Sequence, residues 1–209
     1  MMVTVLFIIF SRALASGKRI LEVLDEKVDI VDAADASDSP ISRGEIEFRN
    51  VSYRYYKNSV EKVLDSINLQ ISAGETVGII GSTGCGKTTV INLIMRFYDV
   101  KEGAILMDGI DTRVLSRALL RHNIGMVLQD TWLFAGTIRD NIIIGKPDAT
   151  EEEIIAAAKA AHAHSFIRRL PDGYDTVIGE SGGTLSQGQK QLLCIPRLML
   201  SPPPVLILD

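Results

Sequence analysis

The stretch that most constrains the fold of this chain is residues 81–89, which read GSTGCGKTT. A short apolar run, residues 76–80, precedes it, and an apolar helical pattern follows from Thr88 to about Tyr98. A glycine, four residues and then Gly-Lys-Thr, placed between a strand and a helix, is the pattern of a phosphate-binding loop. We therefore predict an α/β fold in which 76–80 form a buried parallel strand that leads into this loop.

Each part of the loop has a physical role in holding phosphate groups. Glycines let successive backbone N–H groups turn toward one ligand, and the helix N-terminus adds a partial positive charge. Lys87 is expected to reach the terminal phosphates, the Thr88 hydroxyl to bind Mg2+, and Cys85 to contribute its backbone. The predicted nucleotide-binding residues of the loop are Gly81, Ser82, Thr83, Gly84, Cys85, Gly86, Lys87, Thr88 and Thr89.

Composition argues against several other functions. The 209 residues are 46% hydrophobic, enough to bury the core of one domain with appended subdomains. With 22 basic and 26 acidic residues the net charge is -4, so a broad positive field that attracts nucleic acid is absent. The two cysteines form no CxxC pair, and His162 and His164 point to different sides of a helix. We expect no nucleic-acid partner, no disulfide framework and no histidine metal site.

Apolar residues alternate along two further segments. In residues 46–55 the alternation slips by one position near Asn50, where we predict a bulge or a break in a strand. Residues 67–71 alternate without interruption as a second strand. Asp108-Gly109 lies between apolar residues and predicts a small hairpin, because both positions of its turn need positive φ. The sequence therefore indicates an antiparallel patch beside the parallel core.

Two features near the C-terminus complete the secondary structure. Thr150 and Glu153 have the spacing of a capping box, and we predict a helical region from about residue 151 to 170. Residues 205–208 are apolar and precede Asp209, so we expect a strand with a carboxylate at its tip. In phosphate-loop enzymes an aspartate in this position holds the second side of the Mg2+ site.

The N-terminal part of the chain differs from the rest. Residues 1–10 are almost wholly apolar, but a membrane-spanning helix needs about 20 such residues. Arg12, Lys18 and Arg19 follow, as at the cytoplasmic exit of a membrane helix. Residues 27–43 contain many Asp, Ala and Ser residues and one Pro, without clear periodicity, which is typical of a linker. We therefore divide the chain into a membrane-helix end with its extension (1–26), a linker (27–43) and a nucleotide-binding domain (44–209).

The sequence Leu185-Ser186-Gln187-Gly188-Gln189 resembles the signature motif of the ATP-binding cassette (ABC) proteins, whose usual form has glycine in place of Gln187. The resemblance continues in 127–130 as the glutamine loop, in 133–141 after it, and in 176–182 as the loop that precedes the signature in exporters. Residues 11–26 resemble the segment that joins the last membrane helix of ABC exporters to their nucleotide domain. Nearly the whole chain is covered, in the order of the family.

This resemblance implies a fold and a set of site residues. The fold is the ABC type of P-loop NTPase, with a mostly parallel core sheet, an antiparallel β subdomain and an α-helical subdomain, incomplete at the C-terminus. Tyr55 falls where the family stacks an aromatic ring on adenine. Gln129 is implied as a catalytic residue with Lys87, positioning Mg2+ and the attacking water. Thr88, Gln129 and Asp209 are the implied Mg2+ ligands.

The resemblance also implies partners. Ser186 and Gly188 would face the γ-phosphate of an ATP bound by a second ABC subunit, identical or different, arranged head to tail with this one. The transmembrane domain of an exporter would be the other partner. The nucleotide-binding domain would then act as an ATPase on the cytoplasmic face of the plasma membrane, with ATP and Mg2+ as its cofactors.

Two features depart from the family pattern. The family continues after the aspartate with a glutamate that polarises water, a dimer-contact loop and a switch histidine, which the 209 residues lack, so we expect them to bind ATP without hydrolysing it. Pro196 replaces a small helix-forming residue, and an interior proline costs a helix about 3 kcal/mol. Two other functions remain open: a non-catalytic nucleotide-binding module, or a soluble ABC ATPase that acts on ribosomes or DNA.

Overall fold

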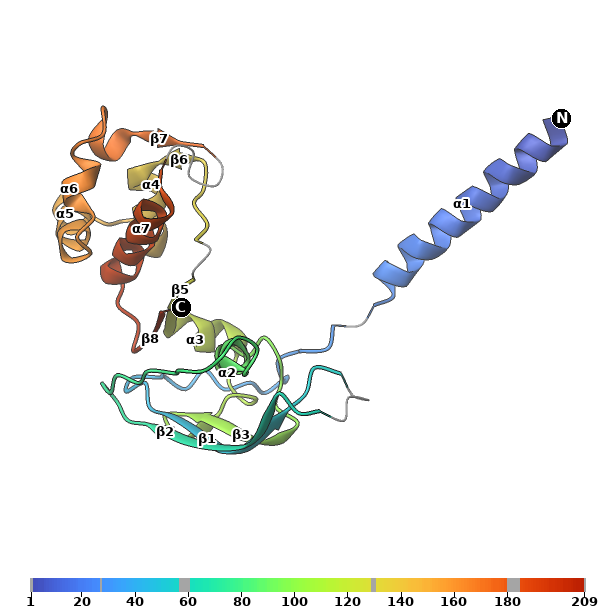
Figure 1. Cartoon of the computed structure of the whole chain (residues 1–209), viewed down its shortest axis with the longest axis horizontal. Helices are drawn as coiled ribbons and strands as arrows, with labels where there is room; N and C mark the ends of the chain where they lie inside the picture. The colour runs from blue at the N-terminus through green and yellow to red at the C-terminus, as the bar shows by residue number, and fades with distance from the viewer. Residues whose placement is uncertain (1, 27, 57–60, 129–130, 180–184, 209) are drawn as a thin grey trace. The chain divides into compact units, whose positions relative to one another are not determined.

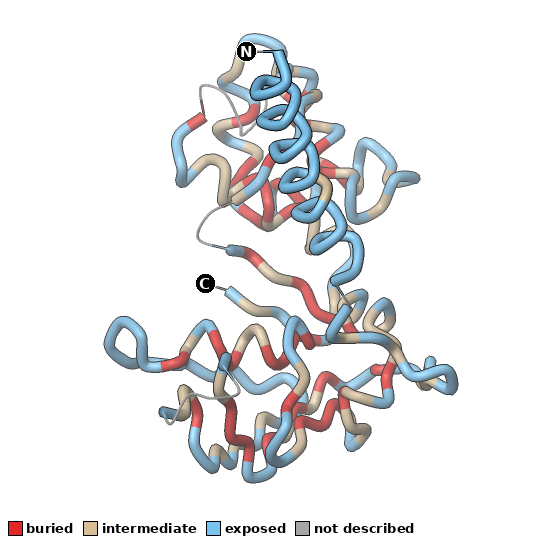
Figure 2. Tube along the Cα trace, turned by 90° about the vertical axis from the view of Figure 1, so that its right-hand side faces the viewer, coloured by how far each residue is buried: buried red, intermediate tan, exposed pale blue. Residues whose placement is uncertain are grey.

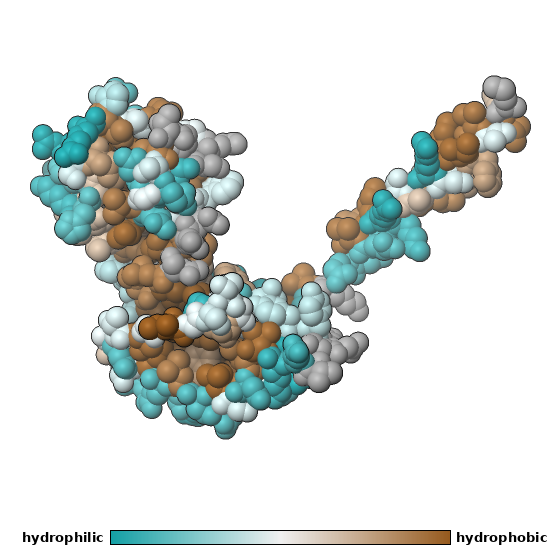
Figure 3. Space-filling model, viewed as in Figure 1, coloured by the Kyte–Doolittle hydropathy of each residue, from teal (hydrophilic) through white to brown (hydrophobic). Residues whose placement is uncertain are grey.

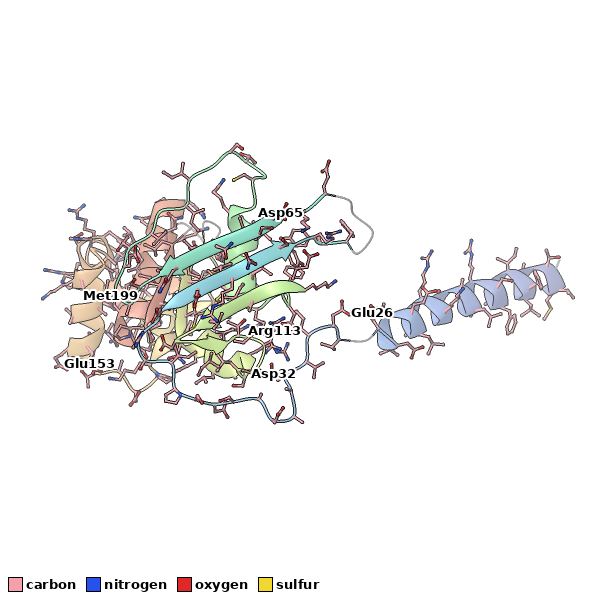
Figure 4. The ribbon with its side chains drawn as sticks, turned by 90° about the horizontal axis from the view of Figure 1, so that it is seen from below. Glu26, Asp32, Asp65, Arg113, Glu153 and Met199 are labelled. Atoms are coloured by element: carbon pink, nitrogen blue, oxygen red, sulfur yellow. The ribbon has the colours of Figure 1, made fainter. Side chains whose placement is uncertain are left out.

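The computed structural model describes residues 2–26, 28–56, 61–128, 131–179 and 185–208 (Figure 1). The chain divides into two compact units, Met1–Val31 and Asp32–Asp209. The boundary between the units lies inside the predicted linker, residues 27–43. The part of this segment from Asp32 onward packs with the larger unit. Asp32 is labelled in Figure 4. Its carboxylate accepts hydrogen bonds from Arg96, at 3.3 Å, and from Arg117, at 3.0 Å.

The smaller unit consists mainly of helix α1, Met2–Leu24, which has no buried residue (Figure 2). Its apolar side chains are on the surface, most densely in its N-terminal half (Figure 3). None of the helices in the described ranges is both long and apolar enough to cross a membrane.

An antiparallel sheet of four strands, in the order β2-β1-β3-β4, forms one side of the larger unit. Its strands are β1 Ile46–Tyr53, β2 Leu64–Ile71, β3 Glu102–Met107 and β4 Ile110–Asp111. The predicted slip in β1 is confirmed, since its register with β2 shifts between Phe48 and Val51 and Asn50 has a φ of 49°. The bulge directs both Phe48 and Val51 into the core, where each is almost fully buried.

The predicted hairpin is also confirmed, with Asp108 and Gly109 at φ values of 49° and 83° between β3 and β4. The Asp108 carboxylate has a second role. It accepts hydrogen bonds from the backbone N–H groups of Ser42 (2.9 Å), Arg43 (2.9 Å) and Glu45 (2.8 Å). Through these bonds the turn holds the chain that leads into β1.

The face of this sheet that packs inward is covered by helices α2, Lys87–Ile94, and α3, Arg117–His122 (Figure 1). Their buried residues include Leu93 and Leu120, which share one core with Phe48 and Met107 of the sheet. Next to this core, β5, Ile124–Val127, and β8, Val205–Leu208, form a parallel pair. Because β8 forms with the predicted bounds, that prediction is confirmed.

A second core lies among the helices of the larger unit that follow β5. Its strands and helices are β6 Gly136–Thr137, α4 Ile138–Ile142, α5 Glu151–Ala160, α6 His164–Ile167, β7 Val177–Ile178, α7 Gln187–Leu200 and the short 3-10 helices η1 Ile143–Gly145 and η2 Gly173–Asp175. The predicted capping box starts α5, with Thr150 and Glu153 bonding each other's backbone. Ile124 belongs to the first core and Val127 to the second, so β5 contributes to both.

One predicted strand does not form. Residues 76–80 have no strand structure, their apolar side chains are exposed, and Ile80 is 98% exposed. A parallel strand needs neighbours that bond its backbone, and in the described part of the chain none pairs with this run. The parallel core of this fold is therefore the β5–β8 pair. The helix predicted from Thr88 to Tyr98 is also shorter, since α2 ends at Ile94.

Replacing Asp108 with asparagine tests the turn that anchors the start of β1. Burial raises the pKa of this carboxyl, but the three backbone hydrogen bonds outweigh burial and hold the pKa below its usual range. A lowered folded pKa means that the stabilisation is present above the unfolded pKa, about 3.9, and is lost as pH falls through the folded pKa. At pH 7 we expect Asp108→Asn to lower the free energy of unfolding by about 1–3 kcal/mol.

Urea unfolding at pH 7 and at about pH 3 measures this effect. The difference between wild type and Asp108→Asn should shrink at the lower pH, because the carboxyl of the unfolded chain is protonated first and the stabilisation decreases as pH falls below the unfolded pKa. Asp35→Asn, at an exposed position, is the control and should change little at either pH. A difference that stays constant with pH would show that the charge of Asp108 does not stabilise the turn.

Candidate nucleotide site

The loop predicted to bind phosphate turns tightly at two glycines. Gly84 has a φ of 82° and Gly86 a φ of 98°, and residues other than glycine rarely adopt such backbone angles. Gly86 also packs against the chain before β2: a Cβ there would lie 2.9 Å from Leu64 Cδ2 and 3.2 Å from the Val63 carbonyl oxygen. The motif therefore needs glycine at position 86 both for its backbone conformation and for lack of space.

Helix α2 begins directly after Gly86, and among the described residues no side chain caps its N-terminus. The first N–H groups of a helix have no partner within the helix, so they can bond an anion that lies at the helix start. Residues 81–85 are exposed there, and Thr88 is exposed in the first turn. This arrangement of backbone donors at a helix start suits a phosphate group.

Lys87 lies across the loop. Its ammonium group donates hydrogen bonds to the carbonyl oxygens of Gly81, at 2.8 Å, and Ser82, at 2.9 Å. An ammonium group has three N–H donors, and the third has only the weak acceptor Cys85 Sγ, at 3.8 Å, within the described residues. A phosphate oxygen is a far stronger acceptor than a thiol, so one Lys87 donor can turn to a ligand while the other two hold the loop.

Tyr55 lies beside the same helix. Its phenol oxygen is 3.1 Å from the Thr89 hydroxyl, and its ring meets those of Tyr53 and Tyr98 edge to face at 5.1 and 5.2 Å between centroids. Tyr53 is only 5% exposed, and burial together with Tyr55 and Tyr98 raises the pKa of Tyr53 to about 12. Tyr55 is 41% exposed and Tyr56 is 78% exposed. Of the three neighbouring tyrosines, Tyr55 is thus both accessible and held next to the loop.

The implied Mg2+ ligands are only partly within the described residues. Thr88 presents its hydroxyl at the exposed start of α2, whereas Gln129 and Asp209 lie outside the described ranges. The strands that lead toward them end side by side, since Val127 of β5 is paired with Leu208 of β8. Hydroxyl, amide and carboxylate oxygens are the ligand types that Mg2+ prefers, so the chemistry of this donor set fits the ion.

The signature residues form the start of α7. Ser186 caps this helix by accepting a bond from the Gln189 N–H at 3.3 Å, and the Gln189 side chain accepts one from the Ser186 N–H at 2.9 Å. Leu185 is buried and fixes the chain to the second core, while Gln187 and Gly188 are exposed. This capping box is not among the predicted features, although its signal, a serine followed three residues later by glutamine, is in the sequence.

Helix α7 continues through Pro196 to Leu200, so the proline does not end it. Contacts outside the helix compensate for the lost backbone bond. Pro196 is itself buried, and Arg197 donates to the Asn141 carbonyl oxygen at 2.6 Å, to Asn141 Oδ1 at 2.7 Å and to the Trp132 carbonyl oxygen at 3.2 Å. Burial among these neutral acceptors lowers the pKa of Arg197. No local pattern in the sequence signals this tether.

Residues 64–209, well over half of the chain, match the protein family described as "ABC transporter". The chain belongs to the ABC transporter family. It is 51% identical over 197 residues to "Uncharacterized ABC transporter ATP-binding protein YfiC" of Bacillus subtilis (strain 168), a match that covers 94% of this chain and 32% of that protein. It is 50% identical over 199 residues to "Putative multidrug export ATP-binding/permease protein YgaD" of the same organism, covering 95% of this chain and 34% of the relative.

A solved structure supports the same assignment. The chain is similar to "Structure of a bacterial Atm1-family ABC exporter with ATP bound", with a TM-score of 0.85 and 37% sequence identity over 95% of this chain and 34% of that one. The predicted family and the ABC type of P-loop NTPase fold are therefore confirmed. The chain spans about one third of the length of the relatives it matches.

Comparing Tyr55→Ala with Tyr56→Ala tests which ring receives the base. Removing Tyr55 should weaken ATP, ADP and adenosine alike, by about 1–3 kcal/mol, because stacking acts on the base that all three ligands share. Removing the more exposed Tyr56 should leave all three affinities unchanged. Isothermal titration of each ligand into each variant measures the affinities, and an effect confined to Tyr56→Ala would reassign the base platform.

Proposed function

We propose that this ABC domain binds ATP with Mg2+ at residues 81–89. The observation that carries the proposal is the start of α2, which follows a glycine-rich turn and has no capping side chain among the described residues. The ammonium group of Lys87 lies across this loop, and one of its three N–H donors has only the weak acceptor Cys85 Sγ among the described residues. Backbone N–H groups, a helix N-terminus and a lysine together form a donor set for a chain of phosphates. Among the described residues, Lys87 has no carboxylate partner that would compete with a phosphate for its charge.

The residues would divide the ligand among them. The backbone of 81–89 and Lys87 hold the phosphates, Tyr55 receives the adenine ring, and Thr88 with Gln129 and Asp209 hold Mg2+. When bound, Mg2+ neutralises charge on the β- and γ-phosphate oxygens. Gln129 would orient the water that attacks the γ-phosphate. Thr89 is close enough to Tyr55 to connect the base and phosphate ends of the site.

We further propose that the domain is the ATPase motor of a membrane exporter. One relative is named as an export ATP-binding/permease protein, and the similar structure is titled as an exporter with ATP bound. Since this chain spans about a third of each, the transmembrane domain would be contributed by the remaining length of such a protein. The domain would then lie on the cytoplasmic face of the membrane.

The signature residues support a second subunit as partner. Ser186, Gln187 and Gly188 are exposed at the start of a 14-residue helix, where backbone donors and the helix dipole favour an anion. Within this chain the phosphate loop is built on a different helix, α2. We propose that the signature faces the γ-phosphate of an ATP held by the partner, so that two subunits meet head to tail with two nucleotides between them.

The nucleotide proposal is tested by comparing ligands that do and do not carry phosphates. Lys87→Ala should weaken MgATP binding by about 1.5–3 kcal/mol, because it removes a charge-assisted contact, and should leave adenosine binding unchanged. Lys159→Ala, which removes an exposed lysine from α5, is the control. Isothermal titration of both ligands gives the two affinities.

Two results would contradict the proposal. Equal losses for MgATP and adenosine in Lys87→Ala would mean that the lysine supports the fold rather than the phosphates. An equal loss of MgATP affinity in Lys159→Ala would mean that net charge, and not the loop, attracts the nucleotide.

A further inference from the structure

The hydrogen bond between Tyr55 and Thr89 joins two parts of the candidate site that are 34 residues apart in the chain. Tyr55 follows the end of β1, and Thr89 is in the first turn of α2. Thr89 is 4% exposed, whereas the preceding Thr88 is exposed, so the two adjacent threonines of the loop have different surroundings. Their different environments indicate different tasks.

We propose that Thr89 is a positioning residue for Tyr55. Its hydroxyl holds the phenol group, so that the ring which receives adenine is fixed to the helix that carries the phosphate loop. This inference rests on the proposed nucleotide function. It adds that the phenol oxygen of Tyr55, and not only its ring, contributes to binding.

The surroundings of Tyr55 explain why such a bond matters. The rings of Tyr53 and Tyr98 meet Tyr55 edge to face, but Tyr55 remains 41% exposed, so these two contacts leave part of the side chain without a packing partner among the described residues. Ordering an exposed side chain on ligand binding costs conformational entropy. A hydrogen bond to a buried group on a rigid helix orders the ring before the ligand arrives, so less of that cost falls on binding.

The bond also has a defined geometry because packing holds Thr89 in place. Thr89 lies between Thr88 and Val90 on α2, and Val90 and Leu93 of that helix are buried in the first core. Gly86 packs against Val63 and Leu64 at the start of β2. The same packing therefore fixes the phosphate loop and the partner of the Tyr55 phenol.

Adenosine is the probe that isolates this effect, because it carries the base without phosphate or Mg2+. We expect Thr89→Val and Tyr55→Phe each to weaken adenosine by about two- to tenfold, the range for one neutral hydrogen bond. The double variant should lose no more than either single one, because both changes remove the same bond. Thr89→Ser, which keeps the hydroxyl, should retain the affinity of the wild type.

The experiment is an adenosine titration of the 209-residue chain followed by NMR, with unfolding curves for every variant. Thr112→Val is the control for replacing a buried threonine, since Thr112 is 3% exposed and no hydrogen bond in the described part of the chain joins it to the tyrosines. It should leave adenosine affinity unchanged. If Thr89→Val does not fold, Tyr55→Phe tests the bond from its exposed end.

The outcomes separate this inference from the proposed function. A wild type that binds neither adenosine nor MgATP would overturn the function itself. A wild type that binds both, with unchanged adenosine affinity in Thr89→Val and Tyr55→Phe, would overturn only the positioning role. Additive losses in the double variant would also overturn it, since two independent contacts would then be at work.

Discussion

Gly86 has a φ of 98° and lies against the backbone of Val63 and the side chain of Leu64, so any side chain at this position would be strained and crowded. The close approach brings the phosphate loop onto the antiparallel sheet and lets α2 begin without a capping side chain. Lys87 and the first N–H groups of α2 come directly after this contact, so their position depends on it. A methyl group at position 86 would crowd Leu64 and the Val63 carbonyl oxygen and strain the backbone that positions them.

The remaining motifs are far from Gly86 in the sequence, and the two cores of the larger unit hold them in place. The first core fixes α2 beneath the loop and brings Tyr55 to Thr89. The second core carries α7, whose start is the signature and whose later turns are tied to Asn141 and Trp132 by Arg197. Because β5 contributes Ile124 to one core and Val127 to the other, it links the elements that carry the two kinds of motif.

Local chemistry in the sequence predicted much of this arrangement. The bulge at Asn50, the Asp108-Gly109 turn and the Thr150–Glu153 capping box each depend on residues close together in the chain, and all three are confirmed. Contacts between distant residues were not predictable in the same way. The bonds from Thr89 to Tyr55 and from Arg197 to Asn141 depend on how elements pack, which no local pattern specifies. The strand predicted at 76–80 does not form for a related reason: a parallel strand needs neighbours that bond its backbone and cover its side chains, an apolar run does not supply them, and no described strand pairs with this one.

Amide hydrogen exchange with and without nucleotide tests the central claim most directly, because the claim concerns backbone N–H groups. MgATP should slow exchange in residues 81–89 of the wild type, while adenosine should not, since only phosphates engage those amides. In Lys87→Ala the slowing by the same MgATP concentration should be much reduced. Unchanged exchange at 81–89 under saturating MgATP, or equal slowing by adenosine, would contradict the assignment of this loop to phosphate binding.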